Sequence, residues 1–394
     1  MDAHPLYDLS PLVQMMALGA IIALGPLTWV WWRHRGASPM RRLHALTLLT
    51  LFLTFDLVLF GAFTRLTDSG LGCPDWPGCY GSASPWGASG PISAAQNAMP
   101  SGPVSHRKAW VEMIHRYLAT GVGVLILVLA VSHWLAPRPR DGDSSSLHAP
   151  ERTSLWWPML TLVWVCIQGA FGALTVTMKL FPAIVTLHLV GGLVLLALLC
   201  VQAVHGGMPY QHRRPVATSP ALRALLWSGL GLLLVQCALG AWVSTNYAVL
   251  ACSEFPKCQG RWWPDMDFDQ GFQLWRPLGF TQDGTHINFA ALTAIHMMHR
   301  LMAGGVLIVL SLLAWWLNSA GGLRTPSRWL AGLIILQLAT GLGNVVFNWP
   351  LLAAVFHTGG AAALVLVLTW VLADSRAVAS TRPGATLSGS GLAI

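Results

Sequence analysis

Nine long apolar runs dominate this chain of 394 residues. A helix needs roughly 20 mostly apolar residues to cross a hydrocarbon core of about 30 Å. Charged residues make up only 10% of the chain, against about 25% in soluble domains. The runs therefore predict an all-α integral membrane protein. The predicted spans cover residues 12–32, 43–64, 112–135, 156–177, 183–204, 222–243, 289–317, 329–347 and 350–373.

The basic residues indicate how these spans are oriented. Arginines gather in the short loops that nine spans place on one side, and short Arg-rich loops stay in the cytoplasm. The longer loops at about 65–111 and 244–288 should then face the outside, the periplasm of a bacterial inner membrane. The net charge of +8 is explained by this bias, without nucleic acid. The predicted cytoplasmic arginines are Arg33, Arg35, Arg41, Arg42, Arg138, Arg140, Arg152, Arg213, Arg214, Arg223, Arg324, Arg328, Arg376 and Arg382.

Two outer-loop stretches resemble each other: "GLGCPDWPGCYG" and "VLACSEFPKCQG". Each has two cysteines separated by five residues, with a proline between them and a glycine two places after the second cysteine. In an oxidising compartment such close pairs form disulfides, which predicts Cys73–Cys79 and Cys252–Cys258. Metal binding is the alternative, although five residues is not a zinc-knuckle spacing.

The similarity extends along the chain as an internal repeat. Gly61 aligns with Gly240 without a gap to the cysteines, "EMIHR" resembles "HMMHR", and "HLVGG" resembles "HTGGA". The chain therefore reads as one leading helix followed by two four-helix units. Each unit has an even number of spans, so both units insert in the same orientation, which implies a pseudo-twofold axis along the membrane normal. The predicted segments are 1–42 (extra helix and cytoplasmic loop), 43–205 (first bundle), 206–220 (linker), 221–373 (second bundle) and 374–394 (cytoplasmic tail).

Each unit has two matched histidines within predicted spans. They are His115 and His188 in the first unit, and His299 and His357 in the second. A lone histidine in a bundle is most often a helix-to-helix hydrogen-bond partner, but four at matched places favour a function. Haem iron takes axial histidines, and four-helix bundles house haem between helices. Nearby glycines, including Gly121, would let a flat macrocycle approach; ordinary small-residue packing is the alternative. Zinc and copper fit less well, with only two ligands per unit.

Charged residues lie next to these histidines. Glu112 precedes His115 by three residues and shares its helix face, which suits proton transfer; the alternative is an acid complementing the helix dipole. Its counterpart is His296, so the units differ, and we expect chemistry in the first and a resident cofactor in the second. Arg65, Arg116 and Arg300 are candidate partners for haem propionates, or they extend to lipid head groups.

The sequence resembles the haem A synthase family. The resemblance is carried by "RLTDSGLGCPDW", "EMIHR", the paired cysteine loops and the "HLVGG" and "HTGG" histidines, and it covers about residues 43–373. The helix at 12–32 departs from the family core of eight helices. The resemblance implies oxidation of the C8 methyl of haem O to a formyl group, giving haem A for terminal oxidases.

The resemblance also implies roles for particular residues. The second unit would hold haem b through His299 and His357, and the first would receive haem O near His115 and His188. Glu112 would be catalytic, and the first cysteine pair would act in redox chemistry or haem transfer. The implied partners are membrane lipid, a haem O synthase and an oxidase assembly factor. The main alternative is a dihaem cytochrome b that exchanges electrons with quinone, and a repeat-built transporter is the other.

Overall fold

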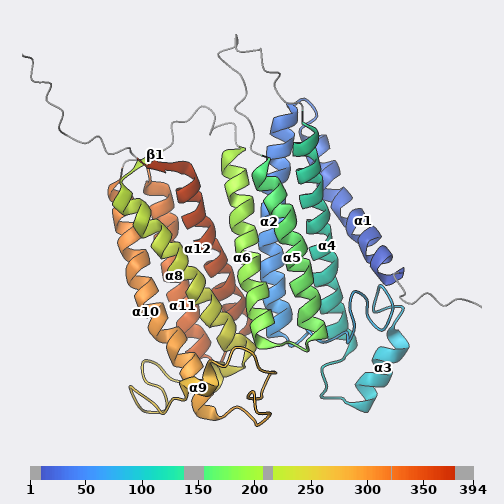
Figure 1. Cartoon of the computed structure of the whole chain (residues 1–394), viewed down its shortest axis with the longest axis vertical. Coiled ribbons are helices and arrows are strands. Elements are labelled where there is room, and N and C mark those ends of the chain that lie inside the picture. Colours follow the sequence, from blue (N-terminus) through green and yellow to red (C-terminus); the bar gives the residue numbers. More distant parts are fainter. Residues whose placement is uncertain (1–9, 137–154, 207–215, 321, 378–394) are drawn as a thin grey trace, which may run out of the picture.

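The computed structural model describes residues 10–136, 155–206, 216–320 and 322–377. These residues form an all-α molecule (Figure 1). Within them, nine helices are long and apolar enough to cross a membrane, as the apolar runs predict. The chain is therefore a multi-pass membrane protein. The spanning helices are α1 (Ser10–Arg33), α2 (Pro39–Leu66), α4 (His106–Leu135), α5 (Trp156–Thr177), α6 (Pro182–His205), α8 (Pro220–Thr245), α10 (Phe289–Ser319), α11 (Arg324–Val346) and α12 (Leu351–Asp374).

Capping residues explain where several helices begin. Ser105 accepts a hydrogen bond from the backbone N–H of Lys108, so α4 begins six residues earlier than predicted. Asn288 caps α10 by accepting from Ala291 N. Such side chains satisfy backbone donors that have no partner within the first helical turn. The helices α2, α6 and α8 begin at Pro39, Pro182 and Pro220. Proline has no backbone N–H, but the N–H of the first helical residue would have no partner within the helix in any case.

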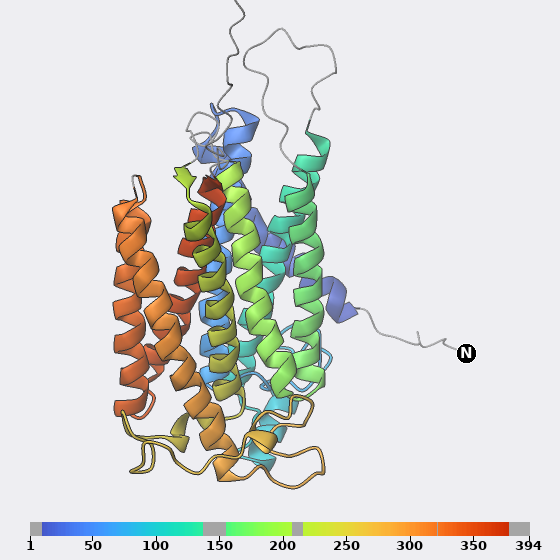
Figure 2. The same cartoon turned by 60° about the vertical axis from the view of Figure 1, so that its left-hand side comes forward.

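The spanning helices pack as neighbours in two matching sets. In the first half, α2 and α5 each contact both α4 and α6; in the second, α8 and α11 each contact both α10 and α12. Between the halves, α6 packs against α12, α2 against α12, and α8 against α6. Figure 2, turned by 60°, shows the two sets from another side. The contact between the halves is apolar and includes the buried residues Leu193, Leu196 and Ala362.

The leading helix α1 packs against α4. Small residues let the two helices approach closely, since the side chain of Thr120 lies against Gly19, and Ile22 of α1 lies against Gly121. Gly121, which we expected near a macrocycle, therefore packs against this additional helix. Met15 of α1 joins a buried cluster with both cysteines of the first loop, so α1 also supports that loop.

The two longer loops, 67–105 and 246–288, contain three short helices that the apolar pattern does not predict. They are α3 (Ser89–Ala98), the 3-10 helix η1 (Ala248–Ala251) and α9 (Phe268–Gly271). α3 and α9 lie at one end of the molecule, and the short strand β1 (Val216–Thr218) lies at the other (Figure 1). β1 pairs in parallel with β2 (Ser375–Ala377), which joins the linker to the end of α12.

Some predicted features lie outside the described residues. They are residues 1–9 of the first predicted segment, residues 207–215 of the linker, residues 378–394 of the tail, and Arg138, Arg140, Arg152, Arg213, Arg214 and Arg382.

Candidate functional site

The two predicted disulfides are present, Cys73–Cys79 and Cys252–Cys258. The Cα atoms of each pair are 4.9 Å apart, within the usual range for a disulfide. All four cysteines are at most 1% exposed. Metal binding, the alternative for these pairs, is not needed, and the described residues contain no group of three or more His, Cys, Asp or Glu that could hold an ion.

A matched tight turn closes each cysteine loop. Cys79 exchanges two backbone hydrogen bonds with Ser82 across Tyr80 and Gly81, which both have positive φ angles of 49° and 72°. In the second loop Cys258 pairs in the same way with Arg261. Two central residues with positive φ define a type I′ turn, in which glycine is favoured. The glycine two places after the second cysteine is therefore required by the turn.

Arg116 and Arg300 hold these loops onto the helices. Arg116 Nη1 donates to the carbonyl oxygens of Asp75, Pro77 and Gly78 at 3.0, 3.1 and 2.6 Å. Arg300 Nη1 donates to Lys257 O at 3.3 Å and Nη2 to Cys252 O at 3.0 Å. Gly78 and Lys257 are repeat counterparts, so both arginines make the same contact. Arg300 Nε is buried without a partner among the described residues.

Glu112 connects the first loop to the start of α4. Its side chain is buried, with 3% of the residue exposed. Oε1 accepts from Arg116 Nη2 at 2.5 Å, and Oε2 accepts from the backbone N–H of Cys73 at 2.8 Å. A carboxylate that is both paired and hydrogen-bonded can remain buried, whereas removing it leaves an unpaired charge. Glu112 therefore links the disulfide loop to the helix that carries His115.

The counterpart of Glu112 binds its loop with the opposite polarity. His296 is 4% exposed, and its Nδ1 lies 3.1 Å from Ala248 O in η1. A carbonyl can only accept, so Nδ1 carries the proton. Glu112 therefore accepts from its loop, whereas His296 donates.

Each of the four matched histidines lies against a glycine on a neighbouring helix. A methyl group at Gly61, Gly172, Gly240 or Gly341 would lie 3.1, 3.5, 2.9 or 3.2 Å from Cε1 of His115, His188, His299 or His357, respectively. The glycines form two pairs of repeat counterparts, Gly61 with Gly240 and Gly172 with Gly341. The histidines that they contact are paired in the same way. The two histidines of each half lie on helices that share the same two neighbours. His115 of α4 and His188 of α6 lie on helices that both contact α2 and α5, and His299 of α10 and His357 of α12 lie on helices that both contact α8 and α11.

This arrangement fits a porphyrin held between two imidazoles. Each half places two half-buried histidines on helices that contact the same two neighbours, and the glycines leave no side chain where each imidazole ring lies. Nδ1 of His115 and Nδ1 of His188 are buried and have no hydrogen-bond partner in the described part of the chain. His357 Nδ1 lies 3.0 Å from Thr340 Oγ1, and His299 Nδ1 lies 3.0 Å from Gln236 Nε2. The sequence repeat does not single out Thr340 or Gln236, because it highlights residues that are alike in both units. At each of these two positions the first unit has an apolar residue instead.

Arg65, the third predicted propionate partner, links the two halves. Its Nη2 donates to Ser244 O at 2.6 Å, and its Nη1 lies 3.2 Å from both Asp68 Oδ1 and the Tyr247 hydroxyl. The guanidinium also stacks on the Tyr247 ring, 4.3 Å from its centroid. Partial burial raises the pKa of the Tyr247 phenol, so the hydroxyl stays protonated and donates to Asp68 Oδ1 at 2.7 Å.

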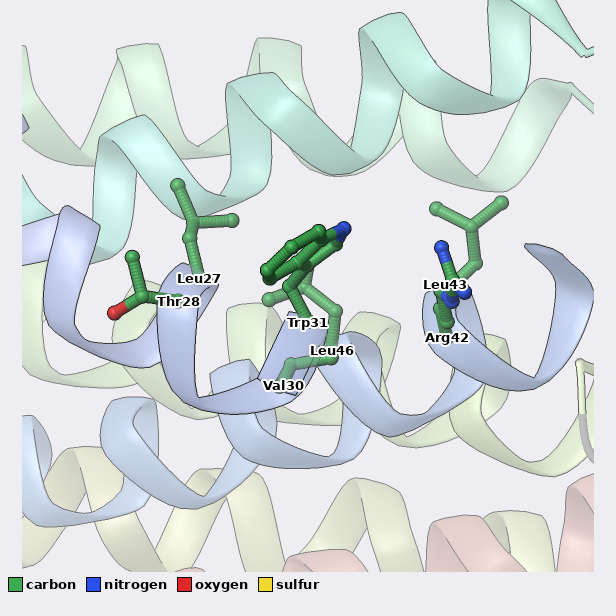
Figure 3. Close-up of a pocket in the computed structure, with 7 residues that line it drawn as sticks. All are labelled: Leu27, Thr28, Val30, Trp31, Arg42, Leu43 and Leu46. Atoms are coloured by element: carbon green, nitrogen blue, oxygen red, sulfur yellow. The ribbon is translucent and has the colours of Figure 1, made fainter. Parts of the chain in front are cut away.

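The groove drawn in Figure 3 is a separate feature of about 360 Å³. Leu27, Val30 and Trp31 of α1 line it with Leu43 and Leu46 of α2. Leu46 precedes Gly61 by 15 residues on α2, which corresponds to about 22 Å along a helix. The groove is therefore distant from His115, and its apolar lining suits lipid chains.

We expect the disulfides to stabilise the loops measurably. Replacing both Cys73 and Cys79 by Ala removes a link between residues six apart, and loop-closure entropy gives a cost of about 2 kcal/mol. The melting temperature in detergent should fall. The matched control is Cys166→Ala, because Cys166 is exposed and unpaired. Equal melting temperatures for the double variant and the control would contradict a stabilising role.

Comparisons with known proteins agree with this geometry. A family described as "Cytochrome oxidase assembly protein" matches residues 44–369. The "Heme A synthase" of Shewanella oneidensis is 38% identical over 326 residues, which cover 82% of this chain and 93% of that protein. The "Heme A synthase" proteins of Symbiobacterium thermophilum and Caulobacter vibrioides are 28% and 27% identical, over 81% and 80% of this chain and 91% of each relative.

The match spans all the helices that carry the repeat and leaves out α1, the helix that departs from the family core. On the extent of the family match and the identity to the first relative, this chain belongs to the haem A synthase family of cytochrome oxidase assembly proteins.

Proposed function

We propose that this protein is a haem A synthase, which oxidises the C8 methyl group of haem O to a formyl group. The observation that carries the proposal is the duplicated pair of imidazoles, each packed against a glycine whose missing side chain makes room for the ring. Family membership supports the same activity. The reaction removes four electrons from the methyl carbon and adds one oxygen atom, so an electron acceptor and an oxygen donor are co-reactants.

We further propose that the spans form two four-helix bundles related by a pseudo-twofold axis. Helix contacts support this arrangement, since α2 meets α12 as α8 meets α6. Residues at matched repeat positions also lie in the same cluster. Leu193 and Ala362 are counterparts and belong to one buried cluster. A residue lies near its own counterpart only close to a twofold axis. The predicted segments 43–205 and 221–373 correspond to these bundles.

The two bundles would divide the work. His299 and His357 would hold a resident haem b, and His115 and His188 would receive haem O. A bound haem b supplies one-electron redox chemistry beside the substrate bundle. The unpartnered Arg300 Nε is a donor that a haem b propionate would satisfy. Arg116 and Arg65 would serve substrate propionates while keeping their protein contacts, because a guanidinium has five N–H donors.

Glu112 would serve the substrate bundle by exchanging protons at its carboxylate and by fixing the disulfide loop. Its contacts to Arg116 and Cys73 support both roles, because they place one acid between the loop and the helix that carries His115. In this proposal the cysteine loops lie on the periplasmic side, as the arginines at the opposite helix ends indicate. A haem O synthase would supply the substrate, and an oxidase assembly factor would receive the product.

Haem analysis of the purified protein tests this function. The full chain is expressed with and without a haem O synthase, and the extracted haems are separated by chromatography. We expect haem b in both cases and haem A only with haem O available. Two equivalents of haem b and no haem A would instead identify a dihaem cytochrome b, and an absence of haem would favour a transporter.

A further inference from the structure

The four candidate haem ligands differ in what contacts their second ring nitrogen, Nδ1. His357 Nδ1 lies 3.0 Å from Thr340 Oγ1 of the neighbouring helix α11. His299 Nδ1 lies 3.0 Å from the side-chain amide of Gln236 on α8. In the first bundle, Nδ1 of His115 and Nδ1 of His188 are buried and make no hydrogen bond within the described residues. The asymmetry therefore involves both histidines of each pair.

The repeat shows why the first bundle lacks these partners. Thr340 precedes Gly341, and the residue that precedes the matched Gly172 is Phe171. Gln236 precedes Gly240 by four residues, and the residue four before Gly61 is Leu57. Apolar side chains cannot accept or donate at Nδ1. The Gln168 carbonyl lies near the His188 ring, but it does not form a hydrogen bond with Nδ1.

Thr340 fixes the tautomer of His357. Its hydroxyl donates to the backbone carbonyl of Leu336 at 2.7 Å, so its oxygen can only accept from His357. Nδ1 must then carry the proton, and Nε2 has the free electron pair that a metal requires. A bond of this kind orients a ligand imidazole and raises its basicity, and removing one typically costs about 10–100-fold in metal affinity.

Gln236 restrains His299 in a similar position. Its amide nitrogen also contacts the His299 backbone oxygen at 3.2 Å, so the side chain bridges the ring and the backbone of the same residue. The backbone oxygen can only accept, so the amide nitrogen faces the ring as a donor, 3.0 Å from Nδ1 and 3.4 Å from Nε2. Gln236 therefore restrains the position of the His299 ring, whereas Thr340 also fixes the tautomer of its histidine. Both imidazoles of the second bundle are therefore restrained by a neighbouring side chain, whereas those of the first are not.

We infer that Thr340 and Gln236 are positioning residues that make the second bundle a permanent haem site. Phe171 and Leu57, at the matched places, leave the first bundle able to release its porphyrin. This inference rests on the proposed function and deepens it, because an enzyme whose product is a haem must bind one haem tightly and exchange the other.

The test compares three variants of the full-length protein in detergent: Thr340→Val, Thr340→Ser and Thr358→Val. Valine keeps the shape of threonine without the hydroxyl, and serine retains the hydroxyl. Thr358 is the matched control, since it adjoins His357 and its hydroxyl donates to Ala354 O of its own helix. The readouts are the rate of haem b transfer to excess apomyoglobin and the haem b midpoint potential.

We expect Thr340→Val to lose haem b roughly tenfold faster than the wild type. Its midpoint potential should rise, because a less basic imidazole stabilises ferric iron less. Thr340→Ser and Thr358→Val should match the wild type. Transfer from Thr340→Val at the wild-type rate would overturn the inference, and so would equally fast loss from Thr340→Ser.

Two further results keep the inference separate from the proposed function. If Thr340→Val yields no folded protein, Gln236→Leu is measured in its place, with the same expected loss and the same overturning result. A wild-type protein that holds haem b but forms no haem A would refute the proposed function alone. The ligand restraint would still be judged by the transfer rates.

Discussion

Replacing Glu112 by Ala should abolish haem A formation while the second bundle keeps its haem b. A residue that transfers protons in a reaction typically contributes about 10²–10⁴-fold in rate. The substitution also leaves Arg116, itself only 8% exposed, without its carboxylate, and Cys73 N–H without its acceptor. Haem A is measured by chromatography of extracted haems, and haem b by the spectrum of the same sample.

Glu112→Gln separates the two roles of this side chain. The amide retains the size of the carboxylate and an oxygen for Cys73 N–H, but it has no negative charge and does not exchange protons at neutral pH. We expect it to keep the loop in place and still to form no haem A. The matched control is Glu254→Gln, in the second cysteine loop, where Glu254 accepts from Gly260 N. Haem A at the wild-type rate from Glu112→Gln would exclude proton transfer by Glu112.

The histidine variants should separate the two bundles. His357→Ala removes one imidazole of the restrained pair, and we expect haem b in the purified protein to fall about tenfold or more, because one axial ligand and its Thr340 contact are lost. His188→Ala removes the matched imidazole of the first bundle. It should keep haem b and lose haem A formation. Both quantities are measured on each variant.

His133→Ala provides the control for the loss of a histidine. His133 is also half-buried, but it lies near the end of α4 that is opposite His115, and its Nδ1 contacts Leu129 O of its own helix. It should match the wild type in both haems. The assignment of the bundles would be reversed if His188→Ala lost haem b and His357→Ala kept it.

Features that depend on local sequence were predictable. The nine spans follow from apolar length, and each predicted span overlaps a helix of the structure. Each disulfide follows from two cysteines close together in one loop, because a short separation along the chain limits the distance between them. The matched glycines could be found because Gly61 and Gly240 align without gaps to the cysteines. These signals need no knowledge of which helices are neighbours.

Features that depend on contacts across the fold were not predictable. The sequence places Glu112 beside His115, but its binding to Cys73 N, 39 residues away, depends on how the loop folds back onto α4. Thr340 is one of many threonines in apolar helices, and only the approach of α12 to α11 brings it to His357. Arg65 was expected to face a propionate or a head group, yet two of its observed partners, Ser244 and Tyr247, lie about 180 residues away, in the other half.

The link formed by Arg65 has a consequence for how the halves came to differ. Arg65 and Ser244 occupy matched repeat positions, as do Asp68 and Tyr247, and these four residues contact one another. In a dimer of two identical units, each residue there would meet its own copy, and two arginines would repel each other. Joining the units in one polypeptide removed that restriction, so unlike side chains could evolve on facing positions. Two copies of either half alone would therefore not reproduce this junction.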